Sequence, residues 1–344
     1  MFMPDLGGLV SCTSGFLNIP LQQIVGFLFY MAILSLMGLG LTLAYQTTRV
    51  PNFAYGFYIG IGMYVSFLGH SKILGIMPPY PLMPLGFLLG GIASLATYLL
   101  VIKPLSSRGA SIVQLMIATI AVDLFGSTLL YILSDYYYYV QKIYTAKGFL
   151  FRSEDVVLIS NPQITAAPII ALVLMPSLVI LLYLFINRTK IGIAMRASIE
   201  SPGLAEIMGI PTNRIYILSW FLSGGLGGLA GALYPMWFYV DPNTPARILI
   251  TVFAVSIAGG LSSIYGPFPG SLLVSYAESI LPSQIYGCLY SVGYPYSSEI
   301  FKYGYVFPMI LIVLFIAFAP TGIAPAISRA AYRLSLIIRV KRYG

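Results

Sequence analysis

The chain has 344 residues, of which 58% are hydrophobic and 8% are charged, with a formal net charge of +8 and a mean hydropathy of +0.89. Soluble domains carry about a quarter charged residues, so this composition excludes a soluble globular protein and indicates a membrane protein. The positive charge does not indicate nucleic-acid binding. It gathers near the end of the chain, at Arg329, Arg333, Arg339, Lys341 and Arg342.

Long charge-free runs predict the membrane segments. A helix needs about 20 apolar residues to cross a bilayer, and continuous runs exclude the alternating pattern of a barrel. We therefore predict an all-α polytopic membrane protein with about nine segments. The segments are expected at 20–45, 51–69, 84–102, 111–133, 166–186, 214–234, 247–263, 267–281 and 303–320.

The positive-inside rule assigns the sides of the membrane. With the basic tail, 326–344, in the cytoplasm, the loops 103–108 and 187–213 also fall inside. The loop 134–165 and the N-terminal segment 1–19 then fall outside, and 20–325 form the membrane domain. Within the outer loop, β-prone runs at 149–159 predict a small hairpin.

Two cysteines, Cys12 and Cys288, both lie on the predicted outer side. Two are too few for a zinc site or a disulfide framework. The outer compartment permits a single bridge, which would tie the N-terminal segment to the loop before the last helix. Two unpaired thiols are the alternative, and we favour it.

Two interrupted segments point to a substrate path. The breaks are "LTLAYQTTRVPNFAYG" (41–56) and "GGLSSIYGPFPG" (259–270). Glycine-rich helices ending in Tyr45 and Tyr234 each lead to a Pro-Asn pair, which suggests two weakly similar halves. Breaks at matching places in two halves commonly mark a binding site near the bilayer midplane. The expected path residues are Tyr45, Asn52, Phe53, Tyr55, Gly56, Gly259, Gly260 and Ser263.

Simpler interpretations of the same residues stay open. The breaks could be plain loops between helices, and Asn52 could only cap a helix that begins at Phe53.

The chain lacks the residues of common enzymes. His70 is the single histidine, which excludes histidine metal sites and Ser-His triads, and no phosphate-binding loop is present. We predict no enzyme activity, metal or cofactor. Asp123 and Glu278 lie inside apolar segments, where an acid costs about 2.5–3.5 kcal/mol. Asp123 is the better candidate for a functional role, and Glu278 is better explained as a hydrogen-bonded side chain near the interface.

The stretch "IGIAMRASIESPGLAEIMGIPTNRI" (191–215) is charged, although apolar runs flank it on both sides. We predict that it forms short amphipathic helices, which are suited to docking into the groove of a soluble partner. Arg196, Glu200 and Glu206 are expected to face the cytoplasm.

This stretch resembles the coupling loop of permeases from the branched-chain amino acid ABC transporters. The matching positions are Gly192, Met195-Arg196-Ala197, Ala205, Met208-Gly209-Ile210 and Arg214. The family usually has an acid and two alanines where this chain has Glu200-Ser201-Pro202-Gly203-Leu204-Ala205.

Three further motifs resemble the same family, and together the four cover about 20–325. Residues 38–56 resemble the first signature of the LivH-like branch, with Tyr55 where the family has His. Residues 258–281 resemble its G-G-x-G-S-x-x-G segment, with Ser262 replacing a glycine and Glu278 matching a common Glu. "PTGI" (320–323) resembles its ending.

The resemblance implies a permease subunit of an ABC importer in the plasma membrane, which translocates branched-chain or related small amino acids. It implies a second, LivM-like permease or another copy of the chain, two cytoplasmic ATPase subunits, an external solute-binding protein and surrounding lipid. The implied ATPase contacts are Gly192, Arg196, Glu200, Glu206, Gly209 and Arg214. The alternative is an ion-coupled secondary transporter of a small solute that uses Asp123 or Glu278.

Overall fold

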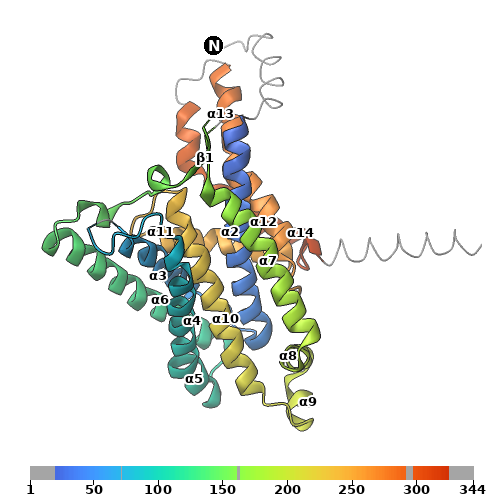
Figure 1. Ribbon diagram of the computed structural model, residues 1–344. Coiled ribbons are helices and arrows are strands. Elements are labelled where there is room, and N and C mark those ends of the chain that lie inside the picture. The colour runs from blue at the N-terminus through green and yellow to red at the C-terminus, as the bar shows by residue number, and fades with distance from the viewer. Residues whose placement is uncertain (1–19, 71, 161–162, 292–296, 325–344) are drawn as a thin grey trace, which may run out of the picture.

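The computed structural model describes residues 20–70, 72–160, 163–291 and 297–324, and it is an all-α bundle (Figure 1). Its helices are α2 (Leu21–Thr48), α3 (Tyr55–Leu68), α4 (Met83–Thr97), α5 (Lys103–Ser107), α6 (Ile112–Asp135), α7 (Ala166–Arg188), α8 (Lys190–Glu200), α9 (Pro202–Ile207), α10 (Thr212–Leu233), α11 (Thr244–Gly259), α12 (Pro267–Ser275), α13 (Leu281–Ser291) and α14 (Val306–Phe318). A small antiparallel hairpin, β1 (Val157–Ser160) and β2 (Gln163–Thr165), leads into α7. The prediction of an all-α polytopic protein is confirmed.

Five helical stretches are long and apolar enough to cross a membrane: Leu21–Thr48, Tyr80–Ser107, Ile112–Val140, Ala166–Arg188 and Thr212–Met236. Three further apolar helices, α3, α11 and α14, are shorter. Each of the nine predicted segments contains a helix, but a count of nine crossings is not confirmed. The segment expected to end at 281 is longer, because α12 widens into a π turn at Tyr276–Ile280 and passes Pro282 into α13.

Some predictions concern residues outside the described ranges. These are the outer placement of 1–19, the basic tail 326–344 and the thiol of Cys12. Cys288 is disulfide-bonded, so the preference for two unpaired thiols is wrong for this residue.

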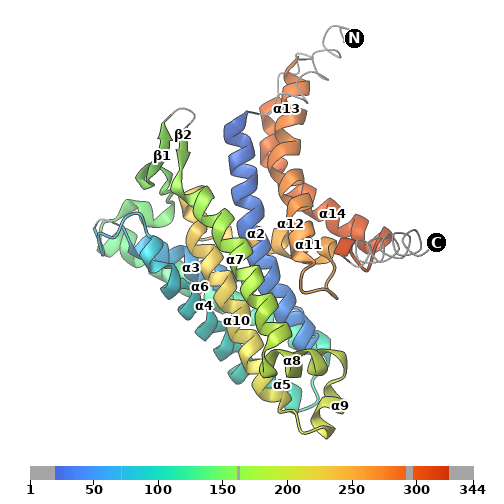
Figure 2. The ribbon, with the colours of Figure 1, turned by 45° about the vertical axis from the view of Figure 1, so that its right-hand side comes forward.

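Helices α2 and α10 form the centre of the bundle, and Figures 1 and 2 show α2 running through its middle. In the most apolar 18-residue stretch of each helix, 78% of α2 and 67% of α10 is buried. In α6 and in α7 the buried share is 22%. The most extensive contacts of α10 are with α4, α3 and α2. Helices α6 and α7 are therefore peripheral, and α2 and α10 form a buried frame for the rest of the bundle.

Glycines allow the backbone of α10 to touch two neighbouring helices. A Cβ atom added at Gly228 would lie 2.2 Å from the carbonyl oxygen of Gly86 in α4, and one at Gly62 in α3 would lie 1.9 Å from that of Gly228. Gly90 and Gly224 make the same kind of contact one turn away. Lipid tails are as apolar as the side chains, so close van der Waals packing of this kind drives helix association in membranes.

The second half of the chain packs along α2. The Ser256 hydroxyl donates to the Gly38 carbonyl (3.3 Å), and the Gln46 amide donates to the Leu261 carbonyl (3.1 Å). Near the other end of α2, the hydroxyl of Tyr30 donates to the Glu278 carboxylate (2.9 Å). These contacts align α12, and the π turn Tyr276–Ile280 that follows it, antiparallel to α2.

The predicted hairpin is displaced along the chain. It forms at 157–165 and not at 149–159. Phe149 and Phe151 are each only 2% exposed, because they pack into an aromatic cluster with Tyr64 and Phe67. Phe149 also exchanges two backbone hydrogen bonds with Val240. Because both rings are buried in this cluster, the hairpin forms from the later residues 157–165.

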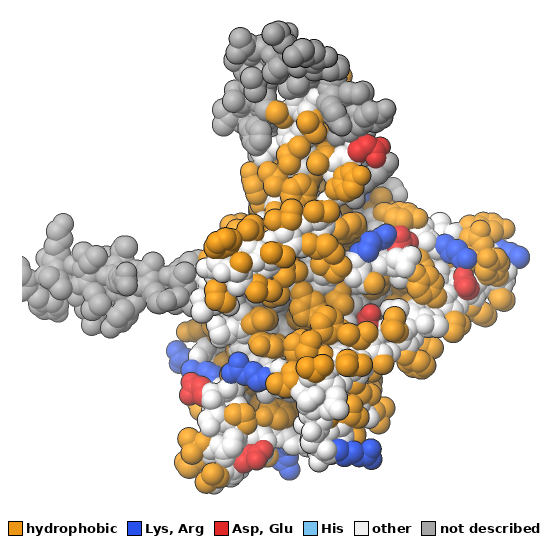
Figure 3. Space-filling model, turned by 180° about the vertical axis from the view of Figure 1, so that it is seen from behind, with side chains coloured by type: hydrophobic (Ala, Val, Ile, Leu, Met, Phe, Trp, Pro, Cys, Tyr) orange, Lys and Arg blue, Asp and Glu red, His pale blue; other side chains and the backbone are white. Residues whose placement is uncertain are grey.

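The two ends of the bundle are distinct. Helices α8, α9 and α5 lie at one end, and the β1–β2 hairpin lies at the other (Figures 1 and 2). The loops 103–108 and 187–213 thus share an end, opposite 134–165. Figure 3 shows one face of the molecule, where hydrophobic side chains cover most of the surface and charged ones gather toward the lower end and the upper right edge.

The glycine contacts generate a stability prediction. Gly228→Leu places a side chain against the Gly86 carbonyl and should destabilise the protein by about 1–3 kcal/mol or more, since overpacking forces the backbones apart. Gly287→Leu is the control, because a Cβ at that position meets no atom within 4 Å. Thermal unfolding of the purified chain in detergent should show a lowered midpoint for Gly228→Leu alone. Equal midpoints for the two variants would contradict the close contact.

Candidate functional site

The first interruption between helices, at 49–54, is stabilised by side chains that accept hydrogen bonds from backbone N–H groups. Helix α2 ends at Thr48, and its C-cap Arg49 adopts a left-handed conformation (φ 57°). Helix α3 then begins at Tyr55, after six non-helical residues, 49–54. The start of any helix leaves several N–H groups without partners, and inside a membrane each needs an acceptor.

Three acceptors meet the N–H groups around the start of α3. Asn52 Oδ1 accepts from the Ala54 N–H (3.1 Å), and Thr119 Oγ1 accepts from the Phe53 N–H (3.1 Å). Asp123 Oδ1 accepts from the Phe57 N–H (3.0 Å). Thr119 and Asp123 are four residues apart, so they lie on one face of α6. The helix begins at Tyr55 with Ala54 at its N-cap position and without a side-chain cap. The alternative that Asn52 caps a helix beginning at Phe53 is therefore wrong, and the Asn52 side chain instead holds the turn that precedes the helix.

The second break follows α11, which ends at Gly259. Gly260 has φ 105°, a conformation that favours glycine, and 261–266 turn back into α12. A Cβ atom at Gly259 would lie 2.0 Å from the Gly266 carbonyl oxygen. The Ser263 N–H donates to the Gly260 carbonyl, which closes the turn. The two glycines thus permit a tight reversal between α11 and α12.

The short helices α3 and α11 lie antiparallel and bring the breaks together. Gly60 of α3 lies beside Pro245 of α11. Gly56, one turn earlier in α3, lies beside Leu249, one turn later in α11. Further along, the rings of Phe53 and Phe253 are 4.9 Å apart between centroids.

An apolar cavity of about 210 Å³ lies at this meeting point. It is lined by Leu41, Tyr45, Pro51, Phe53, Met116, Phe253, Ile257 and Leu261. Apart from Tyr45, the lining side chains are apolar. Phe53, Met116, Phe253 and Ile257 are only partly buried, so the cavity is open toward the outside of the subunit. It can accept a hydrophobic group but offers no charged partner.

The structure separates the predicted path residues into three groups. Tyr45 and Phe53 line the cavity, and Gly260 directly precedes the lining residue Leu261. Asn52 and Tyr55 are fully buried, and the hydroxyl of Tyr55 lies over Gly40 toward α10. The remaining three, Gly56, Gly259 and Ser263, serve helix packing and the turn.

Six lining residues are absent from the predicted path: Leu41, Pro51, Met116, Phe253, Ile257 and Leu261. Each lies in or beside an apolar helix, and no motif distinguishes such residues from ordinary core positions. Only the helix breaks could have indicated their neighbourhood.

Both intramembrane acids have structural partners. Asp123 accepts the Phe57 N–H, as described above. Glu278 lies in the π turn of the α12–α13 helix and accepts from the hydroxyl of Tyr30. These contacts explain how the chain accommodates carboxyl groups at membrane depth.

At the other functional region, α8 and α9 form a projecting end of the bundle (Figure 2). Thr189 caps α8 by accepting from the Gly192 N–H (3.0 Å). Gly192 has no room for a side chain, since a Cβ would lie 2.2 Å from the Phe185 carbonyl oxygen. Met195 is fully buried against α2, α7 and α10. The buried face of α8 therefore anchors this end to three membrane helices.

The outer surface of this end is exposed. Arg196, Glu200, Glu206 and Arg214 all face solvent. Beside them, Leu204, Ile207 and Met208 are 62%, 83% and 76% exposed. Arg196 donates to the Asn187 side chain, and Glu206 accepts from the Thr212 hydroxyl. A cavity of about 320 Å³ lined by Lys190, Ile191, Ala194, Pro211, Arg214, Ile215 and Leu218 adjoins them. Exposed apolar side chains ringed by charges are typical of a protein-binding surface.

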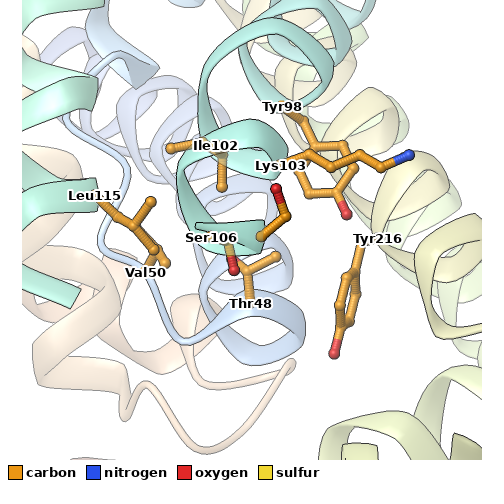
Figure 4. Close-up of a pocket in the computed structure, with 9 residues that line it drawn as sticks. Thr48, Val50, Tyr98, Ile102, Lys103, Ser106, Leu115 and Tyr216 are labelled. Atoms are coloured by element: carbon orange, nitrogen blue, oxygen red, sulfur yellow. The ribbon is translucent and has the colours of Figure 1, made fainter. Parts of the chain in front are cut away.

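A second cavity at the same end lies among α2, α5, α6 and α10 (Figure 4). It has a volume of about 310 Å³ and is lined by Thr48, Val50, Tyr98, Ile102, Lys103, Ser106, Ser107, Leu115 and Tyr216. In Figure 4 the Lys103 side chain runs past Tyr98, and its end points away from Thr48. None of the predicted site residues lines this cavity.

Comparison with known proteins bears on this arrangement. A family model described as the permease component of the branched-chain amino acid transport system matches residues 23–319. The chain is 39% identical to a probable branched-chain amino acid transport permease protein LivH from Methanocaldococcus jannaschii, over 87% of this chain and 90% of the relative. No solved structure matches.

More distant relatives cover as much of the chain. A high-affinity branched-chain amino acid transport system permease protein, BraD of Pseudomonas aeruginosa, is 26% identical over 88% of this chain and 95% of its own length. The corresponding LivH protein of Escherichia coli is 26% identical over 88% and 94%. A family match over residues 23–319, two helix breaks around an apolar cavity and an amphipathic end agree with one another: the chain belongs to the branched-chain amino acid transport system permease family.

Proposed function

We propose that this chain is a membrane-spanning permease subunit of an ATP-binding cassette importer, which translocates branched-chain or related small amino acids across the plasma membrane. The observation that carries the proposal is the meeting of two helix breaks at an apolar cavity, in a chain of this family. Irregular backbone at membrane depth is tolerated where it is buried in protein or lines a pathway. Such breaks commonly mark the site of transport.

The chemistry of the cavity fits the proposed substrate. Its wall presents aliphatic and aromatic groups, which suit the side chain of leucine, isoleucine or valine. The amino and carboxylate groups of a substrate would find no charged partner there. Because unpaired charges are costly in an apolar site, these groups need solvent or a second subunit. The side on which the cavity is open, beside its partly buried residues Phe53, Met116 and Phe253, is where that subunit would lie.

The proposed partners follow from the two ends of the bundle. Two ATPase subunits would dock on α8 and α9, and the absence of a phosphate-binding loop from the sequence agrees with ATP hydrolysis on separate chains. That end would be cytoplasmic. The opposite end, with 134–165 and the start of α2, would face outward and receive the solute-binding protein. The second permease would be a LivM-like chain or another copy of this one.

A reconstitution experiment tests the proposed function. We expect proteoliposomes that contain the chain, its second permease and its ATPase to take up labelled leucine when ATP is inside and the loaded binding protein is outside. An ATPase variant that cannot hydrolyse ATP is the control and should abolish uptake. Uptake that follows a proton or sodium gradient without ATP would instead support the ion-coupled alternative.

The hydrogen bond that Asp123 accepts gives its carboxylate a structural role and yields a second prediction. Asp123→Asn keeps an oxygen that can accept the Phe57 N–H, so uptake should stay near the unmodified level. Asp123→Leu removes the acceptor and leaves the N–H unsatisfied, at a cost of about 1–3 kcal/mol, and should lower stability and uptake together. Glu278→Gln is a parallel test, because its amide oxygen still accepts from Tyr30. A proton-coupled carrier would lose uptake in the Asn and Gln variants as well.

The coupling end yields a third prediction, which concerns Gly209. This residue ends α9 with φ 80°, and its N–H donates to the Glu206 carbonyl. A Cβ atom there meets no neighbour, so Gly209→Leu acts through backbone strain of about 1–2 kcal/mol. The strain should shift α9 and the exposed Ile207 and Met208, reducing uptake per ATP hydrolysed at least several-fold.

The matched control for Gly209 is Gly203→Leu, in the adjoining helix α9. Its Cβ also meets no neighbour, and its φ is not positive. ATP hydrolysis and uptake should be measured together in proteoliposomes for both variants. Coupling that is unchanged in Gly209→Leu would show that the shape of this turn does not matter.

A further inference from the structure

We propose that Phe53 and Phe253 together form the constriction that selects substrates by the size of their side chain. This inference rests on the proposed function and goes beyond it, because it assigns specificity to one residue from each half of the chain. The centroids of the two rings are 4.9 Å apart, and the ring planes are inclined at 34°. They lie at the point where the two breaks meet, and both line the apolar cavity.

The position of Phe53 is set by the backbone. Its N–H donates to the hydroxyl of Thr119, a fully buried side chain of α6. That hydroxyl in turn donates to the Met116 carbonyl one turn earlier (2.7 Å). The neighbouring Asn52 is fully buried and holds the Ala54 N–H. The ring is therefore carried by a short segment fixed on both sides, although it is not part of a helix.

Phe253 is held from the opposite wall. Its neighbours in α11, Val252 and Ala254, are both fully buried. Phe253 itself is only partly buried, so α11 presents this ring to the cavity while its flanking residues anchor the helix. Two rings in contact on separately anchored elements can form a barrier of fixed shape, whereas two flexible side chains cannot.

The rest of the cavity supports selection by size and not by charge. Leu41, Met116, Ile257 and Leu261 complete a wall without charged groups. An apolar pocket discriminates between substrates that differ by one methylene by about 10- to 200-fold. A ring removed from the constriction should therefore relax discrimination against bulky side chains.

The experiment compares turnover of different amino acids in the complete transporter. Leucine, valine and phenylalanine are each supplied on saturating, preloaded binding protein, so the affinity of that protein does not enter the comparison. Phe253→Ala should raise the ratio of phenylalanine to leucine turnover about tenfold or more. Phe253→Trp should narrow the constriction and lower leucine turnover more than valine turnover.

The control is Phe87→Ala. Phe87 forms a comparable ring pair with Phe221, 5.8 Å apart between α4 and α10, and it does not line this cavity. Its ratios should match those of the unmodified protein. If Phe253→Ala does not fold, Phe253→Leu tests the same point with most of the apolar volume kept, and it should shift the ratio in the same direction.

The outcomes separate the two proposals. An unmodified transporter without ATP-dependent leucine uptake would overturn the proposed function. Normal leucine uptake with unchanged ratios in Phe253→Ala and Phe253→Leu would overturn the constriction alone. That second result is also the one expected if lipid tails fill the cavity.

Discussion

The structure depends on how a helix can begin in the middle of a membrane. Helix α3 starts at Tyr55, where water is not at hand to satisfy its free N–H groups. Asn52, Thr119 and Asp123 supply the missing acceptors, and two of the three come from α6. Without them the segment 49–54 would have to form helix or leave the membrane. The position of Phe53, and with it the shape of the cavity, follows from these hydrogen bonds.

A second constraint is the close approach of backbones around α10. Gly228 touches both Gly86 of α4 and Gly62 of α3 through carbonyl groups. This packing holds α3 against a rigid frame while its start remains irregular. Helix α11 is likewise held against α2, by the bond from Ser256 to Gly38. The two short helices can therefore carry a cavity between them, although each is too short to be a stable membrane span alone.

The two regions we assign to function differ in how they are built. The cavity is apolar and lies between fixed elements, which suits recognition by shape. The end formed by α8 and α9 instead presents charges and exposed apolar side chains, such as Ile207, on helices anchored by the buried Met195. A rigid anchor under an exposed surface can transmit a displacement from a bound partner to α2, α7 and α10, which Met195 contacts. Helix α2 also carries Tyr45, a residue of the cavity wall.

The sequence by itself determined the membrane class, the all-α fold, the positions of the helices and the charged end at 191–215. These features depend on local properties: runs of apolar residues, charge and the turn chemistry of Gly and Pro. The family resemblance also rested on short motifs that are readable along the chain. The contact between Asn52 and the Ala54 N–H is likewise local, because the two residues are two positions apart.

Only the tertiary structure decided which residues line the cavity. Phe253 lies 200 positions from Phe53, and its contact depends on α3 and α11 packing antiparallel. Periodicity cannot distinguish such a residue from core, since both are apolar and lie on helices. The same reason explains why Asp123 appeared as a candidate for ion coupling. Its partner, the Phe57 N–H, belongs to another helix 66 residues away, and a hydrogen bond between separate helices leaves no local pattern in the sequence.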